Sequence, residues 1–247
     1  MVDLTSRQIQ ILRSVIDEYL DTAEPVGSER IEKKYDIGVS PATIRNEMAA
    51  LTDQGYLRQP HTSSGRIPTP MALKLYVREL MHKRDVSVAD EIAMKDQIWD
   101  AKDDLRTLLR QTAKIIAQKS RAIGIAYTDH YGAFSSGYSH MYNNREFEDV
   151  NVARTVLALV EETKQLHDIF NKQWDSSDEP VQVVFGSELG NQYLDPISIM
   201  FTEVNQGKSS CTIAIIGSCG INYPRFIPML ERVHDLLSTM IPTENSK

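Results

Sequence analysis

The sequence predicts an α+β protein with two parts, a helical N-terminal part and a C-terminal part that contains an antiparallel sheet. Its 247 residues exceed one typical domain and fall short of three. Charge is divided along the chain, because residues 1–84 hold 12 basic and 11 acidic side chains while the remainder holds 15 basic and 23 acidic ones. Apolar residues follow helical spacing in the first part, and strand-like runs appear only in the second. Segregated charge of this kind indicates two parts with different partners.

The composition argues against several classes of protein. No apolar run approaches the roughly 18 residues of a membrane-spanning helix, and the first residues lack the basic-then-apolar order of a secretory signal. Two cysteines, Cys211 and Cys219, cannot make a disulfide framework or a four-ligand zinc site. We therefore expect a cytoplasmic protein without membrane contact, metal or other cofactor. The net charge of −7 argues against nucleic acid, but residues 41–84 carry seven basic and three acidic side chains, which reverses the balance locally.

The first part begins with signals for two helices. Thr5 and Gln8 form a T-x-x-Q capping box ahead of apolar residues spaced for one helix face. Pro25 and Gly27 interrupt the chain, and Ser28 is expected to cap a short second helix. A tight turn at 36–39 follows.

A third helix and a hairpin come next. Ser40 is expected to cap this helix, with Pro41 in its first turn, where a missing N–H costs nothing. Its inward residues would be Ile44, Met48 and Leu51, and Gly55 stands where a helix end favours a left-handed residue. Residues 56–59 and 66–67 look like short strands around the turn Ser63-Ser64-Gly65. Thr69-Pro70 is expected to start a fourth helix.

The second part is predicted to contain both helices and strands. The pattern predicts a long helix over 92–116, a strand over 122–127, a loop over 128–145 and a helix over 148–171. Strand signals follow at 181–185, 197–204 and 209–217, the last two joined by the turn 205–208. A closing helix runs from Pro224 to about Met240. We expect a sheet with helices on one side.

The order helix, short helix, turn, helix, hairpin is that of a winged helix-turn-helix. An α-helix fits the major groove of DNA, and its N-terminal residues then face the base edges. Arg45 and Asn46 are candidates for base readout, because Arg and Asn can make bidentate contacts with guanine and adenine, and Thr43 would support them. The candidates for positioning the DNA backbone are Ser40, His61, Thr62 and Arg66. Alternatives remain open, since Arg45 and Asn46 also suit a solvated helix face and residues 63–65 an ordinary turn.

Several motifs are similar to those of the heat-inducible transcription repressor HrcA family. They are Leu4-Thr5-Ser6-Arg7-Gln8, Glu24-Pro25-Val26-Gly27-Ser28, the stretch Ser40 to Met48, the stretch Gln59 to Thr69, Gly137-Tyr138-Ser139-His140 through Phe147-Glu148-Asp149-Val150, and Ile216-Gly217 with Ile221-Asn222-Tyr223-Pro224-Arg225. The N-terminal motifs are long and specific, and the C-terminal match is weaker.

The resemblance implies a bacterial repressor of heat-shock chaperone operons that binds an inverted-repeat operator in double-stranded DNA as a homodimer, is released on heat stress and depends on a chaperonin partner. It also implies a winged-helix domain (1–84), a helical linker or dimer helix (85–120) and a GAF-like regulatory or dimerisation domain (121–247). The family's inserted dimerisation domain has no room between Tyr127 and Gly137, so dimerisation would use the 92–120 helix or the sheet.

Other functions are weighed against this one. The sequence lacks G-x-S-x-G, H-E-x-x-H, P-loop and G-x-G-x-x-G motifs, so we expect no enzyme. His130 and His140 flank a Tyr-rich segment that could hold a ligand, but we expect it to be a surface loop. We expect the two cysteines to be buried structural thiols. The main alternative is a sensor of a small molecule. A further alternative is a winged helix that binds another protein. Salt dependence would separate protein binding from DNA binding, because phosphate contacts release counterions and make DNA binding strongly salt-dependent.

Overall fold

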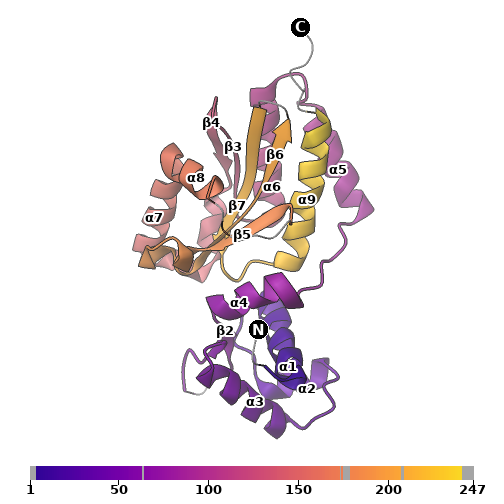
Figure 1. Cartoon of the computed structure of the whole chain (residues 1–247), viewed down its shortest axis with the longest axis vertical. Coiled ribbons are helices and arrows are strands. Elements are labelled where there is room, and N and C mark those ends of the chain that lie inside the picture. The colour runs from indigo at the N-terminus through magenta and orange to yellow at the C-terminus, as the bar shows by residue number, and fades with distance from the viewer. Residues whose placement is uncertain (1–3, 63, 173, 175–178, 207–208, 241–247) are drawn as a thin grey trace. The chain divides into compact units, whose positions relative to one another are not determined.

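A computed structural model describes residues 4–62, 64–172, 174, 179–206 and 209–240 (Figure 1). The chain divides into two compact units, residues 1–82 with 219–223 and residues 83–218 with 224–247. Among the described residues, no helix is long and apolar enough to cross a membrane.

The first unit opens with three helices, α1 (Ser6–Thr22), α2 (Ser28–Lys34) and α3 (Pro41–Asp53). The capping box of α1 is confirmed, because Gln8 N donates to Thr5 Oγ1 over 3.2 Å and Thr5 N donates to Gln8 Oε1 over 3.0 Å. The expected cap of α2 is wrong. Gly27 occupies the N-cap without a side-chain hydrogen bond, and Ser28 already belongs to the helix.

A hairpin and a fourth helix complete the first unit. Strands β1 (Leu57–Arg58) and β2 (Ile67–Pro68) pair antiparallel, with Leu57 opposite Pro68. Helix α4 (Pro70–Leu75) starts where predicted, with Thr69 as its N-cap, and continues into the π-helical segment η1 (Tyr76–Leu80). The hydroxyl of Tyr76 donates to Asp17 Oδ1 over 2.5 Å, which ties this end of the unit to α1.

The second unit contains a five-stranded antiparallel sheet in the order β4-β3-β7-β6-β5. Its strands are β3 (Ile123–Thr128), β4 (Gly132–Ser136), β5 (Val181–Phe185), β6 (Ile197–Gln206) and β7 (Ser209–Ser218). The three predicted strands after residue 180 are confirmed, and β6 pairs with β7 out to Gln206 opposite Ser209. Gly207 and Lys208 of the predicted joining turn lie outside the described residues.

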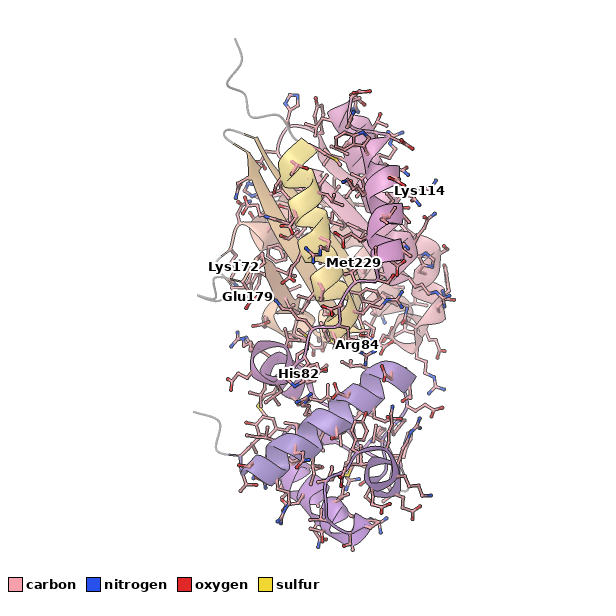
Figure 2. The ribbon with its side chains drawn as sticks, turned by 90° about the vertical axis from the view of Figure 1, so that its right-hand side faces the viewer. His82, Arg84, Lys114, Lys172, Glu179 and Met229 are labelled. Atoms are coloured by element: carbon pink, nitrogen blue, oxygen red, sulfur yellow. The ribbon has the colours of Figure 1, made fainter. Side chains whose placement is uncertain are left out.

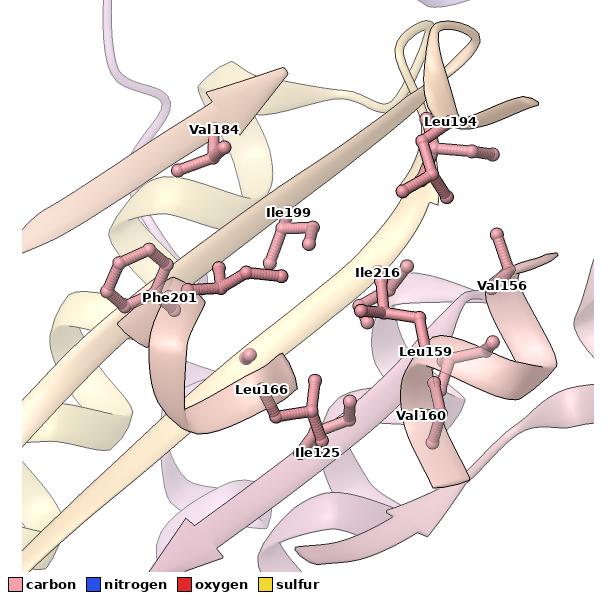
Figure 3. Packing of buried hydrophobic residues seen from close by; sticks show 14 of the residues in the cluster. Ile125, Val156, Leu159, Val160, Leu166, Val184, Leu194, Ile199, Phe201 and Ile216 are labelled. Atoms are coloured by element: carbon pink, nitrogen blue, oxygen red, sulfur yellow. The ribbon is translucent and has the colours of Figure 1, made fainter. Parts of the chain in front are cut away.

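Helices cover both faces of this sheet, so the expectation of helices on one side is wrong. Helices α7 (Val150–Glu161) and α8 (Thr163–Phe170) pack on one face, where Leu159 and Leu166 meet Ile125, Ile199 and Ile216 (Figure 3). Helices α6 (Leu105–Ser120) and α9 (Tyr223–Met240) lie on the other face, and α5 (Val88–Trp99) packs on α6. The buried run 213–216 contributes apolar side chains to both faces, as a strand between two helical layers requires.

Two predicted long helices are each split in two. The 92–116 pattern ends at Trp99, and α6 restarts after Asp104, whose Oδ2 accepts from Thr107 N over 2.8 Å. The 148–171 pattern breaks at Glu162 between α7 and α8. In both cases the apolar period continues across the break, so periodicity alone did not reveal it.

The segment 128–145 is not the expected loop. It contains β4 and the 3₁₀ segment η2 (Tyr138–Asn143), and η3 (Arg145–Glu148) begins at its end. Gly132, at φ +71°, follows the short turn between β3 and β4, so residues 127–137 form a hairpin and hold no inserted domain. The strand escaped prediction because Gly132 to Ser136 lacks alternating apolar residues. The 3₁₀ segments η4 (Gly186–Glu188) and η5 (Gln192–Leu194) connect β5 to β6.

Candidate nucleic-acid interface

The N-terminus of α3 is built by the residues that the sequence indicated. Ser40 is its N-cap and accepts from Thr43 N over 3.3 Å, and Pro41 lies in the first turn. The Ser40 and Thr43 hydroxyls lie 3.1 Å apart. Thr43 is half-buried and engaged in the cap, whereas Ser40 is exposed.

The two faces of α3 separate core from surface. Ile44, Met48 and Leu51 are buried, as predicted, and fix the helix against the unit. Arg45 and Asn46 are both exposed on the opposite side. Within the described ranges, Arg45 forms no ion pair or hydrogen bond, so its guanidinium is available to a ligand.

The turn between β1 and β2 is held by its own hydrogen bonds. Ser64 N donates to His61 O over 2.9 Å, and His61 N donates to Ser64 Oγ over 3.0 Å. The Gln59 amide donates to the carbonyl oxygens of Thr62 and Ser64 over 2.9 and 3.0 Å. His61 and Thr62 are exposed, while Ser63 lies outside the described residues.

Arg66 has a different environment from the other candidates. Its side chain is half-buried, and its Nε donates to Thr52 Oγ1 on α3 over 3.0 Å. Its backbone pairs with Val26, with two N–H···O bonds of 2.8 Å. Gly65 makes this approach feasible, because a Cβ there would lie 2.4 Å from the backbone of Val26. The Arg66 side chain therefore links the hairpin to α3 and also contributes a positive charge.

A groove of about 970 Å³ runs between α2, α3 and the hairpin. Five cationic side chains line it, against the single carboxylate of Glu29: Arg30, Lys33, Lys34, Arg45 and Arg66. Of the predicted residues, Arg45, Thr62 and Arg66 meet in this groove, whereas Ser40, Thr43, Asn46 and His61 lie outside its lining. Arg30 and Lys34 are ion-paired with Glu18, and also with Glu24 and Asp21 respectively. The charges of Lys33, Arg45 and Arg66 are therefore the ones left to attract a polyanion.

A buried carboxylate that the sequence analysis missed fixes the cations of α2. Glu18 is 1% exposed, and its two oxygens lie 2.5 Å from Arg30 Nε and 2.5 Å from Lys34 Nζ. Tyr35 donates its hydroxyl to the same carboxylate over 3.3 Å. Burial raises the pKa of Glu18, but Lys34 and Arg30 outweigh it and the pKa lies below its ordinary value. Arg30 and Lys34 lie four residues apart on α2 and therefore on the same side of the helix. This spacing is the one sequence signal that could have indicated a shared partner.

The two cysteines and His130 have different surroundings. Cys211 is buried on β7, and burial, with the charge of Glu203, raises its thiol pKa to about 12. Cys219 is only half-buried, so the expectation of two buried thiols holds for one of them. His130 packs its ring on Tyr131 at 4.5 Å between centroids. No three His, Cys, Asp or Glu residues in the described part of the chain are placed to hold a metal ion.

These two units make the chain a two-part α+β protein with an antiparallel sheet and a separate cation-lined helical unit. The family model described as "HrcA protein C terminal domain" matches residues 73–227, more than half of the chain. The chain belongs to the HrcA family.

The relatives of this chain are named as repressors. It is 42% identical over 132 residues to the "Heat-inducible transcription repressor HrcA" of Carboxydothermus hydrogenoformans, covering 53% of this chain and 38% of the relative. The proteins of that name from Clostridioides difficile and Desulforamulus reducens are 40% and 34% identical, covering 51% and 66% of this chain and 38% and 46% of each relative. The matches thus span less than half of the relatives' length. Their names are those of transcription repressors and not of enzymes, in agreement with the sequence analysis.

One solved structure supports the fold. The crystal structure of a hypothetical protein matches with a TM-score of 0.73 at 17% identity and covers 96% of this chain and 100% of that chain. At this identity the likeness concerns the fold alone.

Proposed function

We propose that this chain is a transcription repressor that binds double-stranded DNA through its first unit and acts on operators of heat-shock chaperone genes. The observation that carries the proposal is the cation-lined groove beside the exposed face of α3. The order α1, α2, α3, β1, β2 is that of a winged helix-turn-helix. The name of the relatives supports a repressor.

In the proposed complex, α3 enters the major groove and reads base edges with Arg45 and Asn46, with Thr43 supporting the helix start. Ser40, His61, Thr62 and Arg66 position the DNA backbone. Arg30 and Lys34 add two cations at fixed places along the same groove, because Glu18 holds both. This set combines sequence readout with phosphate contact.

An inverted-repeat operator requires two copies of the recognition helix, so the proposed repressor is a homodimer. Exposed apolar residues Val88, Ile92 and Trp99 share one side of α5, which supports self-association through this helix. We assign residues 1–84 to a winged-helix domain and 121–247 to a GAF-like domain. Residues 85–120 hold α5, which would form the dimer, and α6, which packs on the sheet. On heat stress the dimer releases DNA, and a chaperonin restores the binding form.

Selection of DNA from a random pool tests the proposal. We expect an inverted repeat with fixed half-site spacing, which reports DNA binding and symmetry together. Recovery of random sequences would refute sequence-specific repression. Operator binding that survives brief heating without chaperonin would refute the proposed heat release.

A second candidate function is a small-molecule sensor, and one cavity favours it. It measures about 220 Å³ in the second unit, and its lining includes Arg84 and Met229, both labelled in Figure 2. Three cations and two carboxylates, Asp85 and Asp90, share this lining with two apolar methionines, and Lys119 is paired with Asp90. A lining of both charges suits a small zwitterionic ligand. A library of small zwitterionic compounds should then contain members that raise the melting temperature and change DNA affinity, whereas Arg225→Ala should abolish both effects.

A further inference from the structure

Strand β4 leaves one edge of the sheet open. It pairs with β3 over Gly132 to Ser136, and no strand in the described part of the chain pairs with its other side. All five residues are half-exposed. In an antiparallel strand every second residue directs its N–H and C=O toward such an edge, so β4 offers unpaired backbone groups to a ligand.

This edge carries none of the usual protection against pairing. Proteins block exposed edges with charged side chains, proline or bulges. Gly132 to Ser136 contains no charge and no proline, and its register with β3 continues without a bulge. Strand β5 forms the other edge of the sheet, and no described strand pairs with its outer side either. The two edges differ in exposure, because β4 is half-exposed throughout whereas Val181, Val184 and Phe185 of β5 are buried.

A row of cations on α6 runs beside the open edge. The Arg106 guanidinium lies 5.5 Å from the ring centroid of Tyr131, and the Arg110 guanidinium lies 5.9 Å from that of Phe134. Lys114 follows one turn later on the outward side of α6 (Figure 2). Helix α6 contains no acidic residue, although acidic residues outnumber basic ones in the chain after residue 84. In the described part of the chain, Arg110 and Lys114 form no ion pair.

We propose that β4 and the cation row formed by Arg106, Arg110 and Lys114 are a docking site for an extended acidic polypeptide segment, which adds to the sheet as a further strand. The backbone of β4 supplies ladder hydrogen bonds, and alternate side chains of the segment lie toward α6. Carboxylates at those positions meet the guanidinium groups, so charge selects the partner and orients it. The site takes a segment about as long as β4.

Charge and hydrogen bonding separate this partner from two others. A second copy of this chain, paired β4 to β4 about a twofold axis, would bring two rows of cations together on the same face of the joined sheet, and like charges oppose that. A nucleic acid would satisfy the cations, but it offers no regular alternation of donors and acceptors to match a strand edge. An acidic polypeptide satisfies both features.

The test uses the full chain and a blocked, fluorescent peptide that alternates Val and Glu and matches β4 in length, with binding followed by anisotropy. Two further versions of this peptide carry N-methyl groups on alternate backbone nitrogens, one version on the odd-numbered and the other on the even-numbered residues. Because only every second N–H faces the ladder, we expect one register to weaken binding at least about tenfold and the other to bind like the parent. Equal binding of both methylated peptides would overturn strand addition.

The charge of the peptide is tested separately. A peptide that alternates Val and Lys should bind at least about tenfold more weakly than the Val–Glu peptide.

Charge reversal on the protein completes the test. Arg110→Glu should weaken the Val–Glu peptide about tenfold, while Arg154→Glu on α7, the same change at another exposed arginine, should leave it unchanged. Circular dichroism checks that both variants keep the fold. Equal affinity of Arg110→Glu and the parent for the Val–Glu peptide would overturn the proposal. A dimer that forms through β4 would also overturn it. So would a single-stranded oligonucleotide that displaces the peptide at equal concentration.

Discussion

The Nε of Arg66 donates a hydrogen bond to Oγ1 of Thr52 across 3.0 Å and thereby ties the hairpin to the last turn of α3. The Thr52 hydroxyl in turn donates to the carbonyl oxygen of Met48 over 2.7 Å. These two bonds link the hairpin to the helix that presents Arg45 and Asn46.

Loss of the Arg66 bond should weaken this link. Thr52→Val keeps the shape and removes the acceptor, so we expect a loss of about 1 kcal/mol in unfolding free energy. Arg66→Ala also removes a cation from the groove and should weaken specific and random DNA alike, whereas Thr52→Val should affect DNA binding less. Urea unfolding and DNA titration measure the two effects. Unchanged affinity of Arg66→Ala for random DNA would contradict its role at the DNA backbone.

Arg45 should discriminate between DNA sequences. Arg45→Ala is expected to cost about 1–3 kcal/mol on the selected site and to relax the preference at one base position. Arg154→Ala, which removes an exposed cation of α7 in the second unit, is the control and should leave the preference intact. Equal losses on specific and random DNA would instead place Arg45 at the phosphate backbone.

Glu18 should stabilise the first unit at neutral pH. Its pKa is lowered in the folded protein, so its contribution is present above its ordinary value of 4.5 and is lost as the pH falls through the lower folded value. We expect Glu18→Gln to cost about 2 kcal/mol at neutral pH, less than for a fully buried pair because Arg30 and Lys34 are half-exposed. The difference from the parent should vanish in acid. Urea unfolding at both pH values measures it, and a constant difference would exclude the ion pairs as its cause.

Gly65 should tolerate no side chain. A Cβ there would meet the Val26 backbone at 2.4 Å, so Gly65→Ala must displace the hairpin or the chain before α2, at a cost of about 1–3 kcal/mol. Gly27→Ala is the comparison, because a Cβ at Gly27 meets nothing within 4 Å and only the preference of an N-cap for Gly over Ala is lost. Thermal unfolding of both variants tests this, and equal melting temperatures would show that the close approach relaxes freely.

The two thiols should react differently with an alkylating reagent. Burial raises the pKa of Cys211 to about 12, so this thiol stays protonated and covered at neutral pH. We expect native protein to be modified only at Cys219 and unfolded protein at both positions. Mass spectrometry of the parent and of Cys219→Ala distinguishes the sites, since the native variant should take up no label.

Local signals were predicted well from the sequence. The caps at Thr5 and Ser40 and the helix start at Thr69-Pro70 are confirmed because each depends on residues within one turn. The left-handed Gly55, at φ +81°, is confirmed for the same reason. The buried strands β5, β6 and β7 were found because their apolar runs reflect burial directly.

Features that depend on distant residues could not be predicted in this way. The pairing of Glu18 with Arg30 and Lys34 joins two helices, and no local pattern reveals a buried carboxylate. Strand β4 was missed because an edge strand needs no alternation of apolar residues. Of the proposed DNA contacts, the exposure of Arg45 follows from the helical period, whereas the bond between Arg66 and Thr52 follows only from tertiary packing.

The paired backbones of Val26 and Arg66 have a consequence for folding. This bridge closes a loop of chain that contains α2, α3 and β1, so its ordering entropy is offset only once all three elements are in place. The hairpin should therefore be among the last parts of the first unit to form and should not persist alone. Amide hydrogen exchange would then find Val26 and Arg66 opening together, as a single cooperative event.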